Sequence, residues 1–322
     1  MQNSLELAHP IGHQHPGRKL SIKNRSLYAG LSAMNPTFDT VLLTQRRRRA
    51  LAQGVHGADF LMNRAADDLG ERMATVERRF LSAATVFCTT NAAARMLRAS
   101  GKVDHVIRVE ADAAFPGDDD TVVAAPETVP LEPGSLDLAV SLLALQDVND
   151  VPGLLIQIRR ALRPDGLFLG ALAGQGTLSE LRDSLLAAET EIYGGASPRV
   201  SPFVDVRDAG ALLQRAGFAL PVADVETVTV RYDDMFALLR DLRAMGATNI
   251  LTDRARRPVS KRFFLRAAEI YAGRYADPDG RIRATFAFVW LSGWAPHASQ
   301  QKPLKPGSAA MSLAEILGRT ED

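Results

Sequence analysis

Residues 136–173 read LDLAVSLLALQDVNDVPGLLIQIRRALRPDGLFLGALA. The continuous apolar run Leu136–Leu143 comes first and is typical of a strand buried on both faces. A helical pattern follows over Val151–Leu162, and Arg163-Pro-Asp-Gly166 ends it, because proline cannot continue a helix and glycine allows a turn. A second apolar run, Leu167–Ala173, completes the unit. This order predicts two parallel strands joined by a crossover helix.

The same alternation of short apolar runs and helical segments extends in both directions along the chain. It is the pattern of an α/β fold, a parallel sheet covered by helices. Further strands are predicted at Thr85–Cys88, His105–Glu110, Thr121–Ala124, Pro221–Tyr232 and Ala284–Trp294. Further helices are predicted at Asn91–Ala99, Thr177–Tyr193, Val206–Ala216, Met235–Met245 and Ser260–Tyr275. The last two have the position of helices inserted before the final strand.

The texture of the sequence also divides the chain into segments. The predicted segments are a disordered N-terminal tail at 1–33, a helical segment at 34–80, the main domain at 81–296 with inserted helices at about 233–278, and a C-terminal tail at 297–322. A basic run, Arg46–Arg49, lies in the helical segment. Four consecutive arginines point around most of a helix, so we interpret them as a solvated face, with a clamp for an acidic partner as the alternative.

Composition excludes several classes of protein. The chain has 322 residues, of which 46% are hydrophobic and 23% charged, so it can fill a large folded core. Its formal net charge is +1, and no overall field draws it to nucleic acid. The single cysteine, Cys88, excludes an internal disulfide and a cysteine-built zinc site. No run reaches the roughly 20 apolar residues that span a bilayer, and the start lacks a secretory signal, so we expect a cytoplasmic protein without an integral membrane segment.

Candidate ligand groups follow the predicted strands. Ligands of an open parallel sheet bind at the carboxyl ends of the strands, where the strand order reverses. The loop after the first strand is Cys88-Thr-Thr-Asn91, and the helix that it opens offers amides suited to an anion. The second ends at Glu110, which is placed to accept the hydroxyls of a ribose or else is a solvated turn residue. The fourth leads to Gln146 and Asp147 as site candidates, and then to Asn149-Asp150, which we interpret as a helix cap.

Long runs in the later two-thirds of the chain resemble those of a known family. They are DVNDVPG (147–153), ALRPDGLFLGAL (161–172), GTLSELRDSLLAAETEIYGGASPRVSPFVDVRDAGALLQRAGF (176–218), MFALLRDLRAMGATN (235–249) and DGRIRATFAFVWLSGW (279–294). Over roughly Phe38 to Leu313 the chain is similar to the complex I assembly factor five family, within the class I S-adenosylmethionine-dependent methyltransferase superfamily. A more distant similarity is to the malonyl-carrier-protein methyltransferases of biotin synthesis.

The resemblance implies a doubly wound, seven-stranded, mostly parallel sheet with N-terminal helices and a helical insertion before the last strand. It implies S-adenosylmethionine as cofactor, and a protein partner, a subunit of respiratory complex I in which an arginine is hydroxylated. It also implies a cytoplasmic location with peripheral attachment to the inner membrane. The residues expected to line the cofactor pocket are Cys88, Thr89, Asn91, Glu110 and Gln146.

The chain departs from the family at the loop after the first strand. Relatives carry an Asp-x-Gly-x-Gly-x-Gly pattern there, and this chain has Thr85, Phe87, Thr89 and Asn91 at the matched positions. Glycine permits a positive φ and a close approach of the backbone to the cofactor, so its replacement makes cofactor binding doubtful. Ala125 also replaces the acid after the third strand, whereas Glu110 is retained.

Three functions remain open from the sequence. The chain is either a methyltransferase-family enzyme acting on a protein partner in complex I assembly, a binding module of the same fold that no longer holds S-adenosylmethionine, or a methyltransferase of the biotin-synthesis type. No Gly-x-Ser-x-Gly motif or P-loop is present, which argues against a hydrolase or a nucleotide triphosphatase. The sequence does not choose a catalytic base among Asp147, Tyr193 and Arg199.

Overall fold

The computed structural model describes residues 35–115, 117, 120–256 and 258–300. From Pro36 to Gln300 the described residues belong to one compact unit. The predicted tail at 1–33 lies outside the described residues, as does most of the predicted tail at 297–322. No helix of the described part is long and apolar enough to cross a bilayer.

A seven-stranded sheet forms the centre of this unit, with the strand order β3-β2-β1-β4-β5-β7-β6. The strands are β1 (Phe80–Val86), β2 (Val103–Glu110), β3 (Thr121–Val123), β4 (Leu136–Leu142), β5 (Leu162–Ala173), β6 (Ala219–Tyr232) and β7 (Ile282–Trp294). The pairs among β1 to β5 are parallel, and β7 runs antiparallel to both of its neighbours. The doubly wound, mostly parallel sheet expected from the sequence is therefore confirmed.

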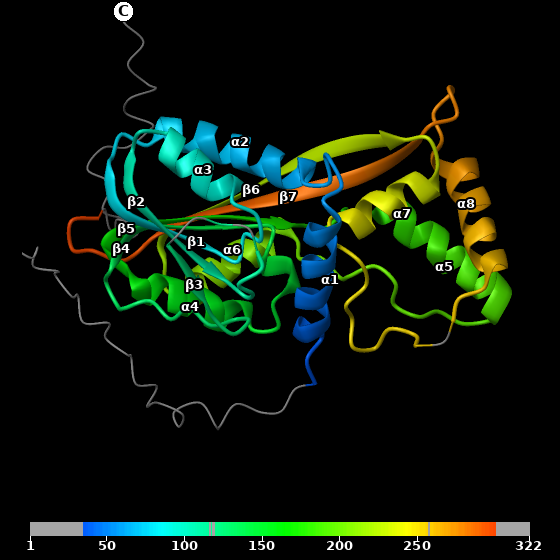
Figure 1. Ribbon diagram of the computed structural model, residues 1–322, viewed down its shortest axis with the longest axis horizontal. Coiled ribbons are helices and arrows are strands. Elements are labelled where there is room, and N and C mark those ends of the chain that lie inside the picture. Colours follow the sequence, from blue (N-terminus) through cyan, green and yellow to red (C-terminus); the bar gives the residue numbers. More distant parts are fainter. Residues whose placement is uncertain (1–34, 116, 118–119, 257, 301–322) are drawn as a thin grey trace, which may run out of the picture. The chain divides into compact units, whose positions relative to one another are not determined.

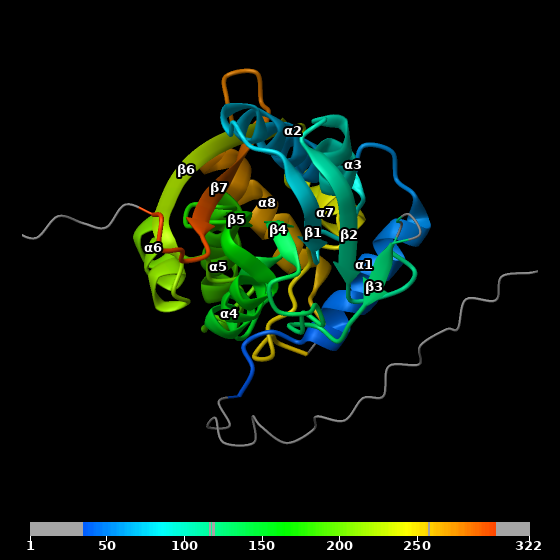
Figure 2. The ribbon, with the colours of Figure 1, turned by 90° about the vertical axis from the view of Figure 1, so that its left-hand side faces the viewer.

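Helices cover both faces of the sheet. They are α1 (Thr40–Gln53), α2 (Phe60–Thr75), α3 (Ala92–Ala99), α4 (Val151–Ala161), α5 (Ser179–Tyr193), α6 (Val206–Arg215), α7 (Met235–Ala244) and α8 (Lys261–Tyr275), with a 3-10 turn at Leu145–Asp147. Figures 1 and 2 show α2 and α3 on one face, and α4 and α6 on the other. Each face has its own apolar core. The expected insertion is also confirmed, since α7 and α8 lie between β6 and β7 in the chain.

The stretch at 136–173 forms the predicted strand, helix and strand, but its second strand starts earlier than predicted. β5 begins at Leu162 and includes Arg163–Gly166, where the sequence predicted a turn, because Leu162 already pairs with Leu136 before a register shift. Every residue of β4 is buried, which explains its uninterrupted apolar run. The Asp150 side chain accepts a hydrogen bond from the Gly153 amide at 2.8 Å and begins α4. The helix ends at Ala161, before Pro164. The crossover from β4 to β5 places both carboxyl ends at one edge of the sheet, which we call the carboxyl edge.

The helical segment at 34–80 contains two helices, and Gly54, with φ +57°, ends the first of them. The start of the sheet differs from the prediction. The first strand begins at Phe80 rather than Thr85. Its early residues include Leu81, which is exposed, and Ser82, so the continuous apolar run that marks a buried strand starts late in the sequence.

Candidate functional site

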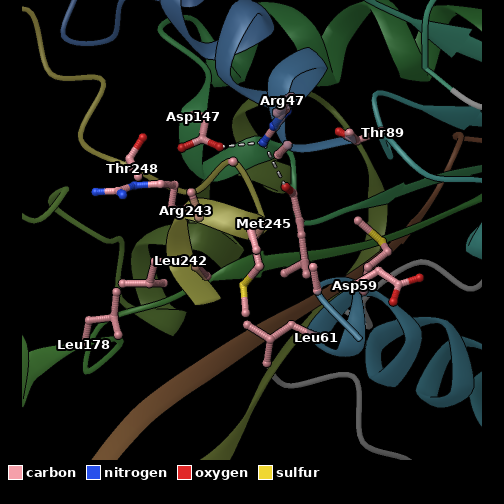
Figure 3. A pocket seen from close by; sticks show the side chains of 18 of the residues that line it. Arg47, Asp59, Leu61, Thr89, Asp147, Leu178, Leu242, Arg243, Met245 and Thr248 are labelled. Carbon is pink, nitrogen blue, oxygen red and sulfur yellow. Dashed lines mark hydrogen bonds and ion pairs between the residues drawn. The ribbon is translucent and has the colours of Figure 1, made fainter. Parts of the chain in front are cut away.

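A cavity of about 730 Å³ opens at the carboxyl edge, beside the point where the strand order reverses between β1 and β4. The segments that follow β1, β4 and β5 contribute to its wall, and so do α1, α2, α5 and α7. Figure 3 shows Arg47 and Asp147 together on one side of it, with Leu61 and Met245 facing them from the other. Its volume is within the range of about 300–1,000 Å³ found for small-molecule sites.

The loop after β1 keeps the backbone of a glycine-rich loop without its glycines. Phe87 has φ +56° and Thr89 has φ +64°, both in the left-handed region that favours glycine. The Phe87 side chain is buried in the core on the α4 side of the sheet. Thr85, at the position of the family's aspartate, is fully buried, and its hydroxyl finds no hydrogen-bond partner in the described part of the chain. Phe87 and Thr89 thus hold conformations that favour glycine, and the Phe87 side chain packs into the core beside the loop.

Glu110 is fully buried at the end of β2 and is held by the protein itself. One carboxylate oxygen accepts the Thr89 amide at 3.1 Å, and the other accepts the Arg108 guanidinium at 3.0 Å. The same guanidinium donates to the Thr90 carbonyl at 3.2 Å, so the pair fastens the loop after β1. Burial raises the pKa of Glu110 to about 7, although Arg108 opposes the shift. Each carboxylate oxygen of Glu110 therefore already accepts one internal hydrogen bond.

A void of about 40 Å³ lies where a nucleoside is expected, between the ends of β1, β2 and β4. Phe87, Glu110 and Phe115 line it, and Leu43 and Arg47 of α1 close it from the other side. A ligand pocket has at least about 300 Å³. The residues of this chain therefore do not fit S-adenosylmethionine in the conformation described.

The five predicted cofactor residues separate into three groups. Thr89, Asn91 and Gln146 line the large cavity, and Glu110 lines the small void together with Thr89. Cys88 is fully buried and lines neither. Burial raises the pKa of its thiol to about 12, so the thiolate that would act as a nucleophile is scarce. Their role as cofactor ligands stays a prediction.

Gln146 forms hydrogen bonds to the ends of two neighbouring strands. Its amide donates to the Leu143 carbonyl at 2.8 Å and to the Asp147 carboxylate at 3.2 Å, and its oxygen accepts the Ala173 amide at 3.4 Å. Gln146 therefore joins the end of β4 to the end of β5. With its polar atoms used in this way, it supports the wall of the cavity and orients Asp147.

Arg47 of α1 is a site residue that the sequence did not indicate. Its guanidinium pairs with the Asp147 carboxylate at 2.7 Å, and both side chains are largely buried. Burial raises the pKa of Asp147, and the charge of Arg47 opposes that shift. Both residues line the large cavity and the small void, so the pair forms part of the wall between the two spaces.

The interpretation of Arg46–Arg49 as a solvated face is confirmed for Arg48 and Arg49, which are exposed, and is wrong for Arg46 and Arg47, which are partly buried. Arg46 donates to the Asn249 carbonyl, Arg47 pairs with Asp147, and Arg48 lies 3.5 Å from Asp112. These contacts link α1 to the insertion and to the ends of the strands. The partners are about 60 to 200 residues away in sequence, and no local pattern announces them.

Arg199 forms a second internal ion pair at the cavity. Its guanidinium makes two contacts of 2.8 Å with the fully buried Glu189 carboxylate, which also accepts the Ser197 hydroxyl at 2.6 Å. Burial alone would raise the pKa of Glu189, but the hydrogen bonds from Arg199 and Ser197 outweigh it and hold that pKa below its usual range. The guanidinium also lies 4.4 Å from the centre of the Phe263 ring. The pair fixes the segment after α5 against the insertion.

The candidate catalytic bases are engaged elsewhere. Asp147 is held by Arg47, and the Tyr193 hydroxyl lies 3.1 Å from the Ser260 hydroxyl, outside the residues that line the large cavity. Arg199 is bound to Glu189. The site therefore presents fixed polar groups and an apolar floor, an arrangement suited to binding a ligand.

Comparisons with known proteins agree with the fold. A family model described as a methyltransferase domain matches residues 85–170. The mitochondrial arginine-hydroxylase NDUFAF5 of Mus musculus is 37% identical over 266 residues, 80% of this chain and 77% of that protein. The NDUFAF5 protein of Dictyostelium discoideum is 48% identical over 189 residues, 58% of this chain but only 43% of that protein.

A second group of relatives carries a different name. The malonyl-[acyl-carrier protein] O-methyltransferase of Laribacter hongkongensis is 39% identical over 186 residues, 58% of this chain and 60% of that protein. The match to the mouse protein covers more of both chains. On the sequence similarity and the sheet order together, this chain belongs to the NDUFAF5 family of methyltransferase-fold proteins.

Proposed function

We propose that this chain serves in the assembly of respiratory complex I as a binding protein with a methyltransferase fold, and that it does not use S-adenosylmethionine. The large cavity at the carboxyl edge is its ligand site. A cytoplasmic location with peripheral attachment to the inner membrane belongs to the same proposal, as does the absence of a nucleic-acid partner. The NDUFAF5 relatives named above are mitochondrial proteins.

The main support for the proposal is the small volume of the nucleoside crevice, the void between the ends of β1, β2 and β4. Phe87 fills it from the sheet, Arg47 and Leu43 fill it from α1, and about 40 Å³ is left. A ligand entering this space would have to displace a buried aromatic ring or separate a largely buried ion pair, each of which costs several kcal/mol. The large cavity needs no such rearrangement. It is open, and internal ion pairs already hold two of its arginines, Arg47 and Arg199.

The alternative is an enzyme that opens the crevice and uses the cofactor. This alternative gives Glu110 an essential role as the ribose ligand, whereas in the proposed function its role is structural. The two hypotheses therefore predict different effects on complex I assembly in cells for variants of the crevice and for variants of the large cavity.

Rescue of complex I assembly in a host lacking this gene separates the two. Leu61→Trp places a large side chain in the cavity, and Phe60→Trp is the matched control because Phe60 precedes it on α2 but does not line the cavity. We expect Glu110→Gln and Phe60→Trp to restore assembled complex I and Leu61→Trp to fail at equal protein level. Loss of rescue by Glu110→Gln, with Leu61→Trp active, would favour the cofactor-dependent enzyme.

A second candidate function is methyl transfer to a carrier-protein substrate, favoured by the similarity to the malonyl-carrier-protein enzyme. Such a reaction needs the methyl donor, and the small volume of the nucleoside crevice argues against binding of that donor. Transfer of label from methyl-labelled S-adenosylmethionine to a malonyl carrier protein tests it directly. We expect no transfer above the level seen without the chain.

A further inference from the structure

The large cavity has a charged side and an apolar side. Figure 3 shows Leu61, Leu178, Leu242 and Met245 on the side away from the Arg47–Asp147 pair. These side chains come from α2, from the start of α5 and from the end of α7, and together they form an apolar side of the cavity that we call its floor. An apolar floor of this kind favours a ligand with a long apolar part.

The charged side chains of the cavity are mostly arginines. Arg47, Arg95, Arg199 and Arg243 line it, against the carboxylates of Asp59 and Asp147. Asp147 neutralises Arg47, and the buried Glu189 neutralises Arg199. Arg95 and Arg243 have no ion-pair or hydrogen-bond partner within the described ranges, and both are exposed to solvent. Two cationic side chains at this site can therefore pair with an anionic ligand.

Arg95 stands beside further donors at the start of α3. Asn91 precedes the helix, lines the cavity, and its side chain makes no hydrogen bond to any described residue. The Thr90 carbonyl accepts a hydrogen bond from Arg108, and the Thr90 hydroxyl accepts one from the Ala92 amide. An anion near Asn91 would meet the positive end of the α3 dipole and the Arg95 guanidinium one turn further on.

We propose that the cavity binds an amphiphile with a single linear apolar chain and a carboxylate headgroup. The headgroup contacts Arg95 and the Asn91 amide, and the chain lies over Leu61, Leu178 and Met245. This inference rests on the proposed function only in taking the large cavity as the ligand site. A guanidinium ligand, such as an arginine side chain, is disfavoured because the cavity already holds an excess of arginines and only Asp59 remains without a pairing cation among the described residues.

Calorimetric titration of the full chain with dodecanoate tests this assignment. Butyrate carries the same headgroup without the chain, and dodecyltrimethylammonium carries the chain with the opposite charge. We expect dodecanoate to bind at least about tenfold more tightly than either probe, because the apolar contacts and the charge-assisted hydrogen bonds act together. Equal affinity for the cationic amphiphile would overturn the proposal.

Arginine variants locate the headgroup. Arg95→Met is expected to weaken dodecanoate binding by about tenfold or more, and Arg95→Lys to weaken it less, because lysine keeps the charge but not the planar donor set. Arg240→Met is the control, since Arg240 is an exposed arginine of α7 that does not line the cavity, and we expect its affinity to stay within about twofold. Unchanged binding by Arg95→Met would place the headgroup elsewhere and contradict the assignment.

A thermal unfolding series excludes a detergent effect. A ligand that binds only the folded chain raises the unfolding temperature as its concentration rises. We expect dodecanoate below its micelle concentration to raise it for the wild-type chain, whereas a fall would contradict specific binding. Binding of S-adenosylmethionine is measured in a separate titration. If that titration contradicts the proposed function, the dodecanoate experiments still test the ligand assignment.

Discussion

At the scale of single residues, the loop after β1 shows how a site can be lost while its backbone is kept. Phe87 and Thr89 hold left-handed conformations that glycine adopts at little cost. A β-branched residue in this region carries strain of about 1–3 kcal/mol, which the surrounding structure must offset. Here the bonds from Thr89 and Thr90 to the Glu110–Arg108 pair supply that support.

Replacing Thr89 by glycine should relieve this strain. We expect Thr89→Gly to increase the free energy of unfolding by about 1 kcal/mol, because the gain in the folded state exceeds the added freedom of the unfolded chain. Thr90→Gly is the matched control, since Thr90 does not have a positive φ, and it should be neutral or destabilising. Urea denaturation measures both. A destabilised Thr89→Gly would show that the loop is not strained.

Glu110 should make stability depend on pH. Its pKa is raised to about 7 in the folded chain, so between its unfolded value near 4.5 and 7 the folded state binds more protons than the unfolded state. The free energy of unfolding should then fall as pH rises through this window, by up to about 1.4 kcal/mol per pH unit from this group.

Glu110→Gln removes that contribution. We expect the variant to show a flatter dependence of unfolding free energy on pH between 4.5 and 7, although its stability at pH 8 should be lower because Arg108 loses its buried carboxylate. Glu132→Gln, at an exposed position, should leave the slope unchanged. Denaturant titrations at several pH values give the slopes, and identical slopes for wild type and Glu110→Gln would refute the assignment.

At the scale of elements, α1 is the helix that closes the crevice. Its Asp39 cap pairs with Arg254 at 3.2 Å, and Phe38 bridges to Leu251, so the helix is fastened to the insertion at its start. Farther along, Arg47 fastens it to the end of β4. The helix therefore joins the insertion to the carboxyl edge and covers the small void.

The Arg47–Asp147 pair should couple α1 to the sheet. We expect Arg47→Met to lower the free energy of unfolding by about 3 kcal/mol, because it leaves a largely buried carboxylate unpaired. In a double-mutant cycle with Asp147→Asn, the coupling energy should be about 1–3 kcal/mol. Arg49→Met is the control on the same helix, exposed and without a described partner, and should change stability by less than about 0.5 kcal/mol. A coupling near zero would mean that the pair does not hold α1.

At the scale of the whole molecule, the sequence predicted the architecture better than the site. Periodicity places nearly every strand and helix, because the buried run of β4 and the cap of α4 are local features. The site depends on contacts between distant segments, such as Arg47 with Asp147, which local patterns do not encode. The sequence did mark Phe87 and Thr89 as departures from the family loop. The sequence could not predict the volume of the cavity that remains beside Phe87 and Thr89.

Titration of the wild-type chain with S-adenosylmethionine tests most directly whether the nucleoside crevice is closed. We expect no saturable heat up to about 1 mM, which corresponds to a free energy of binding weaker than about −4 kcal/mol. Saturable binding with a micromolar Kd would contradict it, because a cofactor of that size cannot enter while Phe87 and Arg47 hold the positions described here.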